Sequence, residues 1–89
     1  KKQDRWDKKW RIVLFDIPEK HKKARDALRF HLKKMGFFEY QKSVFVIPYP
    51  CFKEITFLVE FYKIKPFVRH VLAEKLDNEL HIKSYFNLL

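Results

Sequence analysis

Two short apolar segments, each closed by a proline, constrain the fold of this chain most strongly. The first runs from Trp10 to Ile17 and the second from Ser43 to Ile47, and both are rich in β-branched and aromatic residues. A proline has no backbone N–H for a sheet ladder and fixes its own φ angle, so Pro18 and Pro48 should end these segments. The pattern predicts two buried β-strands.

The segment after Pro18 has helical spacing. Apolar residues recur there at intervals of three and four up to Met35, which predicts an amphipathic helix over 19–35 that Gly36 closes. Similar arguments from spacing, proline breaks and capping residues predict the rest. The remaining elements are a helix over 51–64, strands at 37–40 and 67–73, and a C-terminal tail or short helix capped by Asp77, with Leu80, Ser84 and Leu88 on one side.

The order strand, helix, strand, strand, helix, strand is that of the split βαβ, or ferredoxin-like, arrangement. We therefore predict an α+β fold of βαββαβ order, with a four-stranded antiparallel sheet and two helices on one face. Half of an 89-residue chain would be too small to bury a core of its own, so residues 10–89 are expected to form one domain. The charged segment 1–9 is expected to be a polar arm or linker.

The two central strands do not alternate apolar and polar residues. Segments 12–15 and 44–47 are apolar throughout, whereas a strand with one face in water alternates. Both faces of the sheet are therefore expected to be covered, although two helices cover only one. A second copy, a missing domain or the C-terminal tail would cover the other, and we favour a homodimer because closed twofold assemblies are the commonest oligomers.

The charge of the chain favours polyanions as partners. Twenty Lys and Arg against eleven Asp and Glu give a net charge of +9, which makes nucleic acid the first partner to consider. The first predicted helix carries a basic stripe that can follow a phosphate backbone, made of Lys20, Lys22, Lys23, Arg25, Arg29 and Lys33. The alternative is that this stripe is a solvated helix face.

The mode of binding follows from what surrounds the stripe. Most of five phenylalanines fall on core periodicities, so base stacking is not indicated. The five are Phe15, Phe37, Phe45, Phe57 and Phe61. Because no helix-turn-helix pattern is visible, contacts should follow the backbone and shape of double-stranded DNA or RNA rather than its base sequence.

Asp16 is the one candidate catalytic residue, because it ends the first apolar segment. One carboxylate is a poor Mg²⁺ site, but two copies of Asp16 facing each other across a dimer axis could hold a metal that activates water against a phosphodiester. The other interpretation, which the residues favour, is that Asp16 ends the strand and accepts hydrogen bonds in a turn. No cofactor is then required, and Mg²⁺ belongs only to the nuclease alternative.

The sequence lacks the patterns that mark zinc sites, phosphate-binding loops and membrane-spanning helices. The four histidines have no ligand spacing, Cys51 has no second cysteine, and one glycine cannot build a phosphate-binding loop. No apolar stretch approaches the roughly 20 residues that cross a bilayer. We therefore expect no zinc site and no membrane association, and the single cysteine favours a reducing, cytoplasmic location.

Two families have similar motifs. The segments "RIVLFDIPE" and "QKSVFVIP" resemble the small CRISPR-associated endoribonuclease, the second subunit of the spacer-acquisition complex beside the integrase. Its strand-ending aspartate matches Asp16, and its Gln-x-Ser-Val-Phe segment matches Gln41, Ser43, Val44 and Phe45. This resemblance covers roughly residues 10–75. It implies an adaptor that clamps duplex DNA next to an integrase subunit and, in some members, an endonuclease that uses Mg²⁺.

The segments "WDKKWRIVLFDIPE", "ARDALRFHLKKMGF" and "QKSVFVIPYPC" resemble more closely the middle domain of the phenylacetate-repressor, or PaaX-like, transcriptional regulators. In that family a winged-helix domain precedes this one, and the chain starting at Lys1 is compatible with such a missing N-terminal partner. The resemblance implies a dimerising, nucleic-acid-associated domain that carries out no reaction. We favour this function, with the metal-dependent nuclease and a pure protein-interaction module as alternatives.

Overall fold

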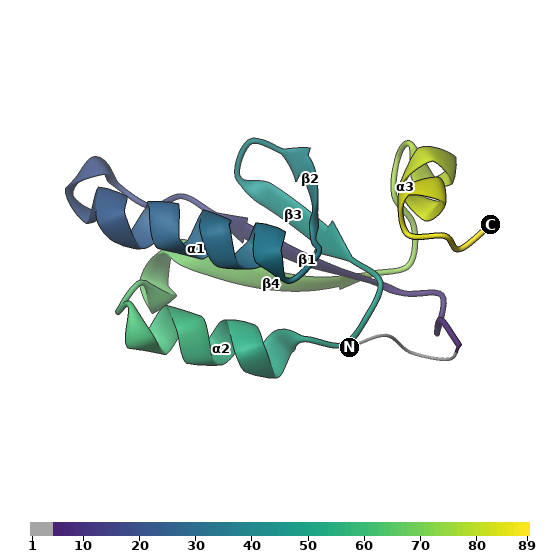
Figure 1. Cartoon of the computed structure of the whole chain (residues 1–89). Helices are drawn as coiled ribbons and strands as arrows, with labels where there is room; N and C mark the ends of the chain where they lie inside the picture. Colours follow the sequence, from purple (N-terminus) through teal and green to yellow (C-terminus); the bar gives the residue numbers. More distant parts are fainter. Residues whose placement is uncertain (1–4) are drawn as a thin grey trace.

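The structure, a computed structural model, describes residues 5–89 and has the predicted order of elements (Figure 1). Its strands are β1 (Trp10–Phe15), β2 (Phe38–Gln41), β3 (Val44–Ile47) and β4 (Val68–Ala73). Its helices are α1 (Lys22–Lys34), α2 (Phe52–Phe61) and α3 (Glu79–Tyr85), and two short 3₁₀ turns lie at Glu19–His21 and Lys65–Phe67.

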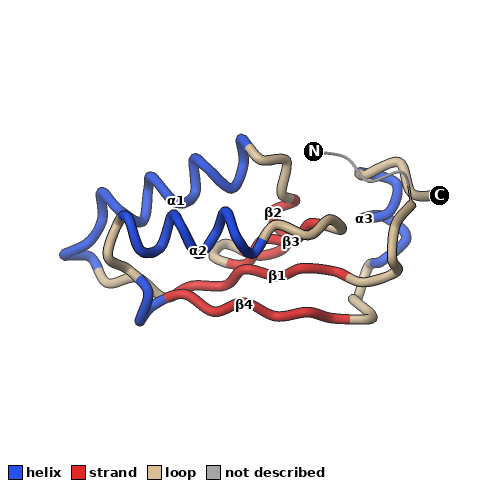
Figure 2. Tube along the Cα trace, turned by 90° about the horizontal axis from the view of Figure 1, so that it is seen from below, coloured by secondary structure: helices blue, strands red, loops and turns tan. Residues whose placement is uncertain are grey.

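The sheet confirms the predicted fold class. Its strand order is β2-β3-β1-β4 and every neighbouring pair is antiparallel, as in ferredoxin-like domains. Figure 2 shows α1 and α2 side by side over the sheet, with α3 at the opposite end from the start of α1. No helix among residues 5–89 is long and apolar enough to cross a membrane.

All three helices end in the same way. Gly36, Lys63 and Asn87 follow them with φ angles of 98°, 59° and 60°, in the left-handed region. In each case the next residue donates its N–H to a carbonyl five positions back, which is the Schellman motif. These bonds are Phe37 to Leu32 at 3.1 Å, Ile64 to Val59 at 2.9 Å and Leu88 to Lys83 at 2.8 Å. The predicted role of Gly36 is confirmed, whereas the other two caps carry no glycine to mark them.

The main core lies between the sheet and the pair α1 and α2. Leu28 and Leu32 of α1 and Ile55 of α2 are fully buried there, as their spacing predicts. Val13 and Phe45 meet them from the two central strands. Burial of this apolar surface holds the two helices on one face of the sheet.

A second, smaller core covers part of the other sheet face. Ile82 of α3 is fully buried against Trp10 and Val46, so the C-terminal segment supplies one of the coverings that the sequence left open. Farther along the sheet the covering is incomplete. Ile12, Leu14 and Val44 are only half-buried and Val71 is 40% exposed. We call these four residues the open strip.

The helix α3 differs in detail from its prediction. Asp77 is not the N-cap, because Asn78 precedes the helix in a left-handed conformation with φ of 61°. The Glu79 carboxylate instead accepts the N–H of Leu76 at 3.2 Å. Leu80 is 72% exposed and Ser84 is exposed, so of the predicted side only Leu88 packs on this core, and Ile82 faces the sheet.

Most of the five phenylalanines considered lie in the core as predicted, because Phe15, Phe37 and Phe45 are buried. The other two do not. Phe57 and Phe61 lie on the outer side of α2, each 66% exposed, and their rings stack on each other with centroids 6.0 Å apart. The buried stripe of α2 is formed by Ile55 and Val59. One helix face can pack on the sheet, and these smaller residues occupy it.

The segment before β1 is bonded to the domain. Asp7 accepts two hydrogen bonds from the buried Arg11, at 2.6 and 3.0 Å, and these hold the pKa of its carboxyl below the usual value. Arg11 also donates to the Pro48 carbonyl at 2.8 Å. The indole Nε1–H of Trp6 donates to the Lys9 carbonyl at 2.8 Å. These bonds fasten the end of the predicted arm to the start of the central strand β1.

Candidate nucleic-acid interface

Asp16 lies exposed at the end of β1, between two neighbouring strands. Its N–H donates to the Phe67 carbonyl at 2.9 Å, and the Phe15 N–H donates to the Ser43 carbonyl at 3.1 Å. Because β1 is antiparallel to both neighbours, its end meets the starts of β3 and β4. The α1 start, the β2–β3 turn and the α2–β4 connection therefore gather at this end of the molecule.

We call this region the basic end. Figure 1 shows the start of α1 and the end of α2 at the same extremity of the fold. The basic residues in these segments are Lys20, Lys22, Lys23, Arg25, Lys42, Lys63, Lys65 and Arg69. Four of the predicted contacts thus lie at the same end as four cations that the sequence reasoning did not select. The four predicted ones are Lys20, Lys22, Lys23 and Arg25.

A hollow of about 570 Å³ lies between the β1–α1 connection and the β2–β3 turn. Four cations and three carboxylates line it, so its net charge is close to balance. They are Lys22, Arg25, Arg29 and Lys42, with Asp16, Glu19 and Asp26. The acidic side chains reduce the positive field inside the hollow, and the outward-facing lysines around it carry the excess.

The two arginines of the predicted stripe form hydrogen bonds and ion pairs within the domain. Arg25 donates to the Ile17 carbonyl at 3.3 Å and pairs with Glu19 at 3.1 Å. Arg29 donates to the Lys42 carbonyl and pairs with Glu39 at 3.0 Å. The guanidinium of Arg29 also lies 5.5 Å from the centre of the Phe45 ring. Arg29 therefore joins α1 to the β2–β3 hairpin.

The lysines of the stripe differ in their availability. Lys22 pairs with Asp26 at 3.5 Å and Lys33 with Glu39 at 3.6 Å, both on the surface. Lys20 and Lys23 are exposed and make no ion pair with any of residues 5–89. These two are the members of the stripe best placed to meet an external phosphate.

The four cations that the sequence reasoning did not select all lie in or next to the connections at the end of β1. Lys42 lies in the β2–β3 turn, Lys63 and Lys65 follow α2, and Arg69 is the second residue of β4. None of them lies on a helical stripe, so a search for periodic charge overlooks them. The predicted strand order was sufficient to find them, because it places all these turns at the end of β1.

Asp16 has no set of metal ligands around it within the described residues 5–89. Nowhere in residues 5–89 do three His, Cys, Asp or Glu side chains lie together as a possible metal site. Mg²⁺ takes six oxygens in octahedral geometry and keeps several of them as waters. A site at Asp16 would therefore need oxygens from a second chain, from nucleic acid or from water.

The strand order and the basic end define the class of this domain. It is a ferredoxin-like α+β domain with a basic end and a third helix on the second sheet face. The family model described as the PaaX protein central Cas2-like domain matches residues 3–84 of the 89. The chain therefore belongs to this family, which confirms the resemblance to the PaaX-like middle domain. No curated protein and no solved structure matches the chain.

Proposed function

We propose that this chain is a dimerising, nucleic-acid-associated domain of a PaaX-like transcriptional regulator and that it carries out no reaction. The observation that carries the proposal is the basic end, where cations from several separate segments meet. Cations on turns at one end of a rigid fold can contact phosphates on the same side of a duplex. The net charge of +9 adds long-range attraction.

A second copy of the chain is the proposed occupant of the open strip. The strip is apolar and lies beside the covered half of the same sheet face, and it runs toward Asp16 along β1. A second copy would remove Val71, the most exposed member, from water. A twofold contact here would also place two basic ends on one assembly, which doubles the number of phosphates within reach.

The nucleic-acid proposal is tested with a short duplex DNA at several salt concentrations. Lys20→Glu combined with Lys23→Glu should lower the affinity and reduce the slope of log K against log salt by about two, because each phosphate contact contributes about 0.9. The matched control is Lys53→Glu combined with Lys75→Glu, which makes the same charge change on exposed lysines away from the basic end. The control should keep the slope of the unmodified chain.

Two outcomes would contradict the proposal. Equal effects of the two double variants would mean that only the net charge attracts the duplex. No binding at low salt would favour the protein-interaction module. The Arg29 side chain is a poor choice for this test, because its bonds to Lys42 and Glu39 hold the hairpin and its removal would disturb the fold.

The second candidate function is a metal-dependent phosphodiesterase. The observation that favours it is the exposed Asp16 at the centre of the basic end, where a bound phosphodiester would lie. The test is incubation of duplex and single-stranded substrates with Mg²⁺, using the unmodified chain and Asp16→Asn. Cleavage by the unmodified chain that Asp16→Asn abolishes, with the oligomeric state unchanged, would replace the non-catalytic proposal.

A further inference from the structure

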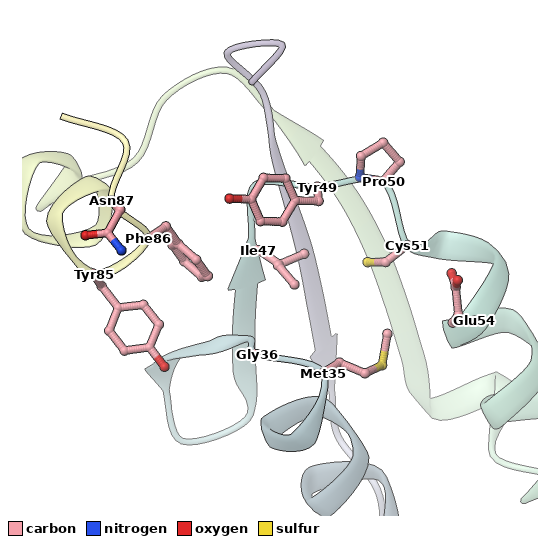
Figure 3. A pocket seen from close by; sticks show the side chains of 10 residues that line it. All are labelled: Met35, Gly36, Ile47, Tyr49, Pro50, Cys51, Glu54, Tyr85, Phe86 and Asn87. Carbon is pink, nitrogen blue, oxygen red and sulfur yellow. The ribbon is translucent and has the colours of Figure 1, made fainter. Parts of the chain in front are cut away.

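A cavity of about 530 Å³ lies at the other end of the fold, away from the basic end (Figure 3). The turn after α1, the connection from β3 to α2 and the end of α3 surround it. Met35, Ile47 and Tyr49 contribute to its wall from the core domain, and Phe86 contributes from the C-terminal segment. Its size and apolar wall suit a small organic molecule.

Three aromatic rings form one side of this cavity. Phe86 meets Tyr49 edge to face, with ring centroids 6.4 Å apart and an interplanar angle of 84°. It meets Tyr85 in the same way, at 4.8 Å and 85°. Rings that stand perpendicular to one another present both faces and edges to a bound molecule, and the faces attract cations.

The charge of the cavity is opposite to that of the protein. Glu54, in the first turn of α2, is the only charged side chain among the residues of 5–89 that line it, although the whole chain carries +9. The influence of this carboxylate reaches Cys51 beside it, where it adds to burial in raising the pKa of the thiol to about 11. Arg11 acts there in the opposite direction, but its guanidinium is bonded to Asp7 and the Pro48 carbonyl.

We propose that this cavity binds a small organic cation, an aryl or alkyl ammonium. The apolar body would lie against Met35, Ile47 and Phe86, and the ammonium group would face Glu54 on the opposite side of the cavity. A carboxylate ligand would meet only Glu54 as a charged neighbour and would be repelled. The site is independent of the basic end, and it spans the junction between the core domain and the end of α3.

The test is an amide NMR titration of the chain with three probes that share a phenyl ring and a two-carbon side chain. Phenethylammonium is the cation, phenethyl alcohol the neutral analogue and phenylacetate the anion. We expect the cation to bind about threefold to fivefold more tightly than the alcohol, as for a partly exposed ion pair, and the anion to bind most weakly. The signals of Gly36, Phe86 and Asn87 should shift together.

Two variants separate the charge from the shape of the site. Glu54→Gln should remove the advantage of the cation over the alcohol and leave the affinity for the alcohol unchanged. Glu60→Gln is the matched control, since it makes the same change on the same helix outside the cavity. Tyr85 is exposed, so Tyr85→Ala should preserve the fold and weaken all three probes.

Three results would overturn the proposal. These are phenylacetate binding as tightly as the cation, no shifts at Gly36, Phe86 and Asn87 with any probe, or a preference for the cation that survives Glu54→Gln. Each result excludes the cation site without bearing on nucleic-acid binding at the basic end.

Discussion

Replacing Ile82 by alanine tests whether α3 covers the second sheet face in solution. The side chain is fully buried against Trp10 and Val46, and the change removes three carbons. At about 0.8 kcal/mol for each buried carbon, the transfer cost is roughly 2.4 kcal/mol, and the cavity left behind raises it to about 3 kcal/mol. That is a large part of the roughly 4–13 kcal/mol expected for the stability of 89 residues.

The assay is urea unfolding followed by tryptophan fluorescence, because Trp6 and Trp10 lie next to α3. Leu80→Ala is the matched control on the same helix: its side chain is 72% exposed, so the free energy of unfolding should change by less than about 0.5 kcal/mol. If α3 detaches before the rest unfolds, the Ile82→Ala chain should also show a smaller m-value. Equal free energies for the two variants would refute the packing of α3 on the sheet.

Three further predictions concern a turn, a pH dependence and a thiol. Gly36→Ala should lower the free energy of unfolding by about 1–2 kcal/mol in urea titrations, because φ is 98° there and no neighbouring atom interferes with the added carbon. Asp7→Asn should destabilise by about 1 kcal/mol at pH 7. Since the folded pKa of Asp7 lies below 3.8, the stabilisation is complete above about pH 4, and unfolding curves at lower pH should bring variant and parent together. Burial, and then the charge of Glu54, raises the pKa of Cys51 to about 11, so at pH 8 its reaction with Ellman's reagent should be roughly a hundredfold slower than in the urea-unfolded chain.

The fold could be predicted because its signals are local. The apolar segments that became β1 and β3, the spacing of Leu28 and Leu32, and the glycine after α1 each specify their own element. The order of the elements then selects the ferredoxin-like arrangement. The fold of such a sequence can be predicted because the local preferences of its segments agree with the global topology.

The sequence is least informative at positions whose burial depends on packing between segments that are distant in the chain. The sequence left open what covers the second sheet face, because nothing near Ile82 indicates that Trp10 and Val46 lie opposite it. Likewise, Phe57 and Phe61 are as apolar as the buried Phe15 and Phe45, but they lie outside because the stripe of Ile55 and Val59 packs on the sheet. Exposure of a large ring is set by its neighbours in space.

The candidate site was located only in part for a related reason. Charge periodicity selects the stripe on α1, but it cannot distinguish a cation that meets solvent from one that holds a hairpin, as Arg29 does through Glu39. A backbone acceptor such as the Lys42 carbonyl, which binds Arg29, cannot be recognised from the sequence. Lys20 and Lys23 remain the sharper candidates because no carboxylate among residues 5–89 pairs with them.

The two parts of the proposed function should respond to salt in opposite directions. Dimerisation through the open strip brings together two chains of charge +9 and buries apolar surface such as Val71, so added salt should strengthen it by screening the repulsion. Phosphate contacts at the basic end should weaken over the same range, because salt removes the gain from counterion release. Duplex DNA at low salt would neutralise both chains and favour the dimer. A dimer that dissociates as salt rises, without DNA, would mean that ion pairs rather than the open strip hold it.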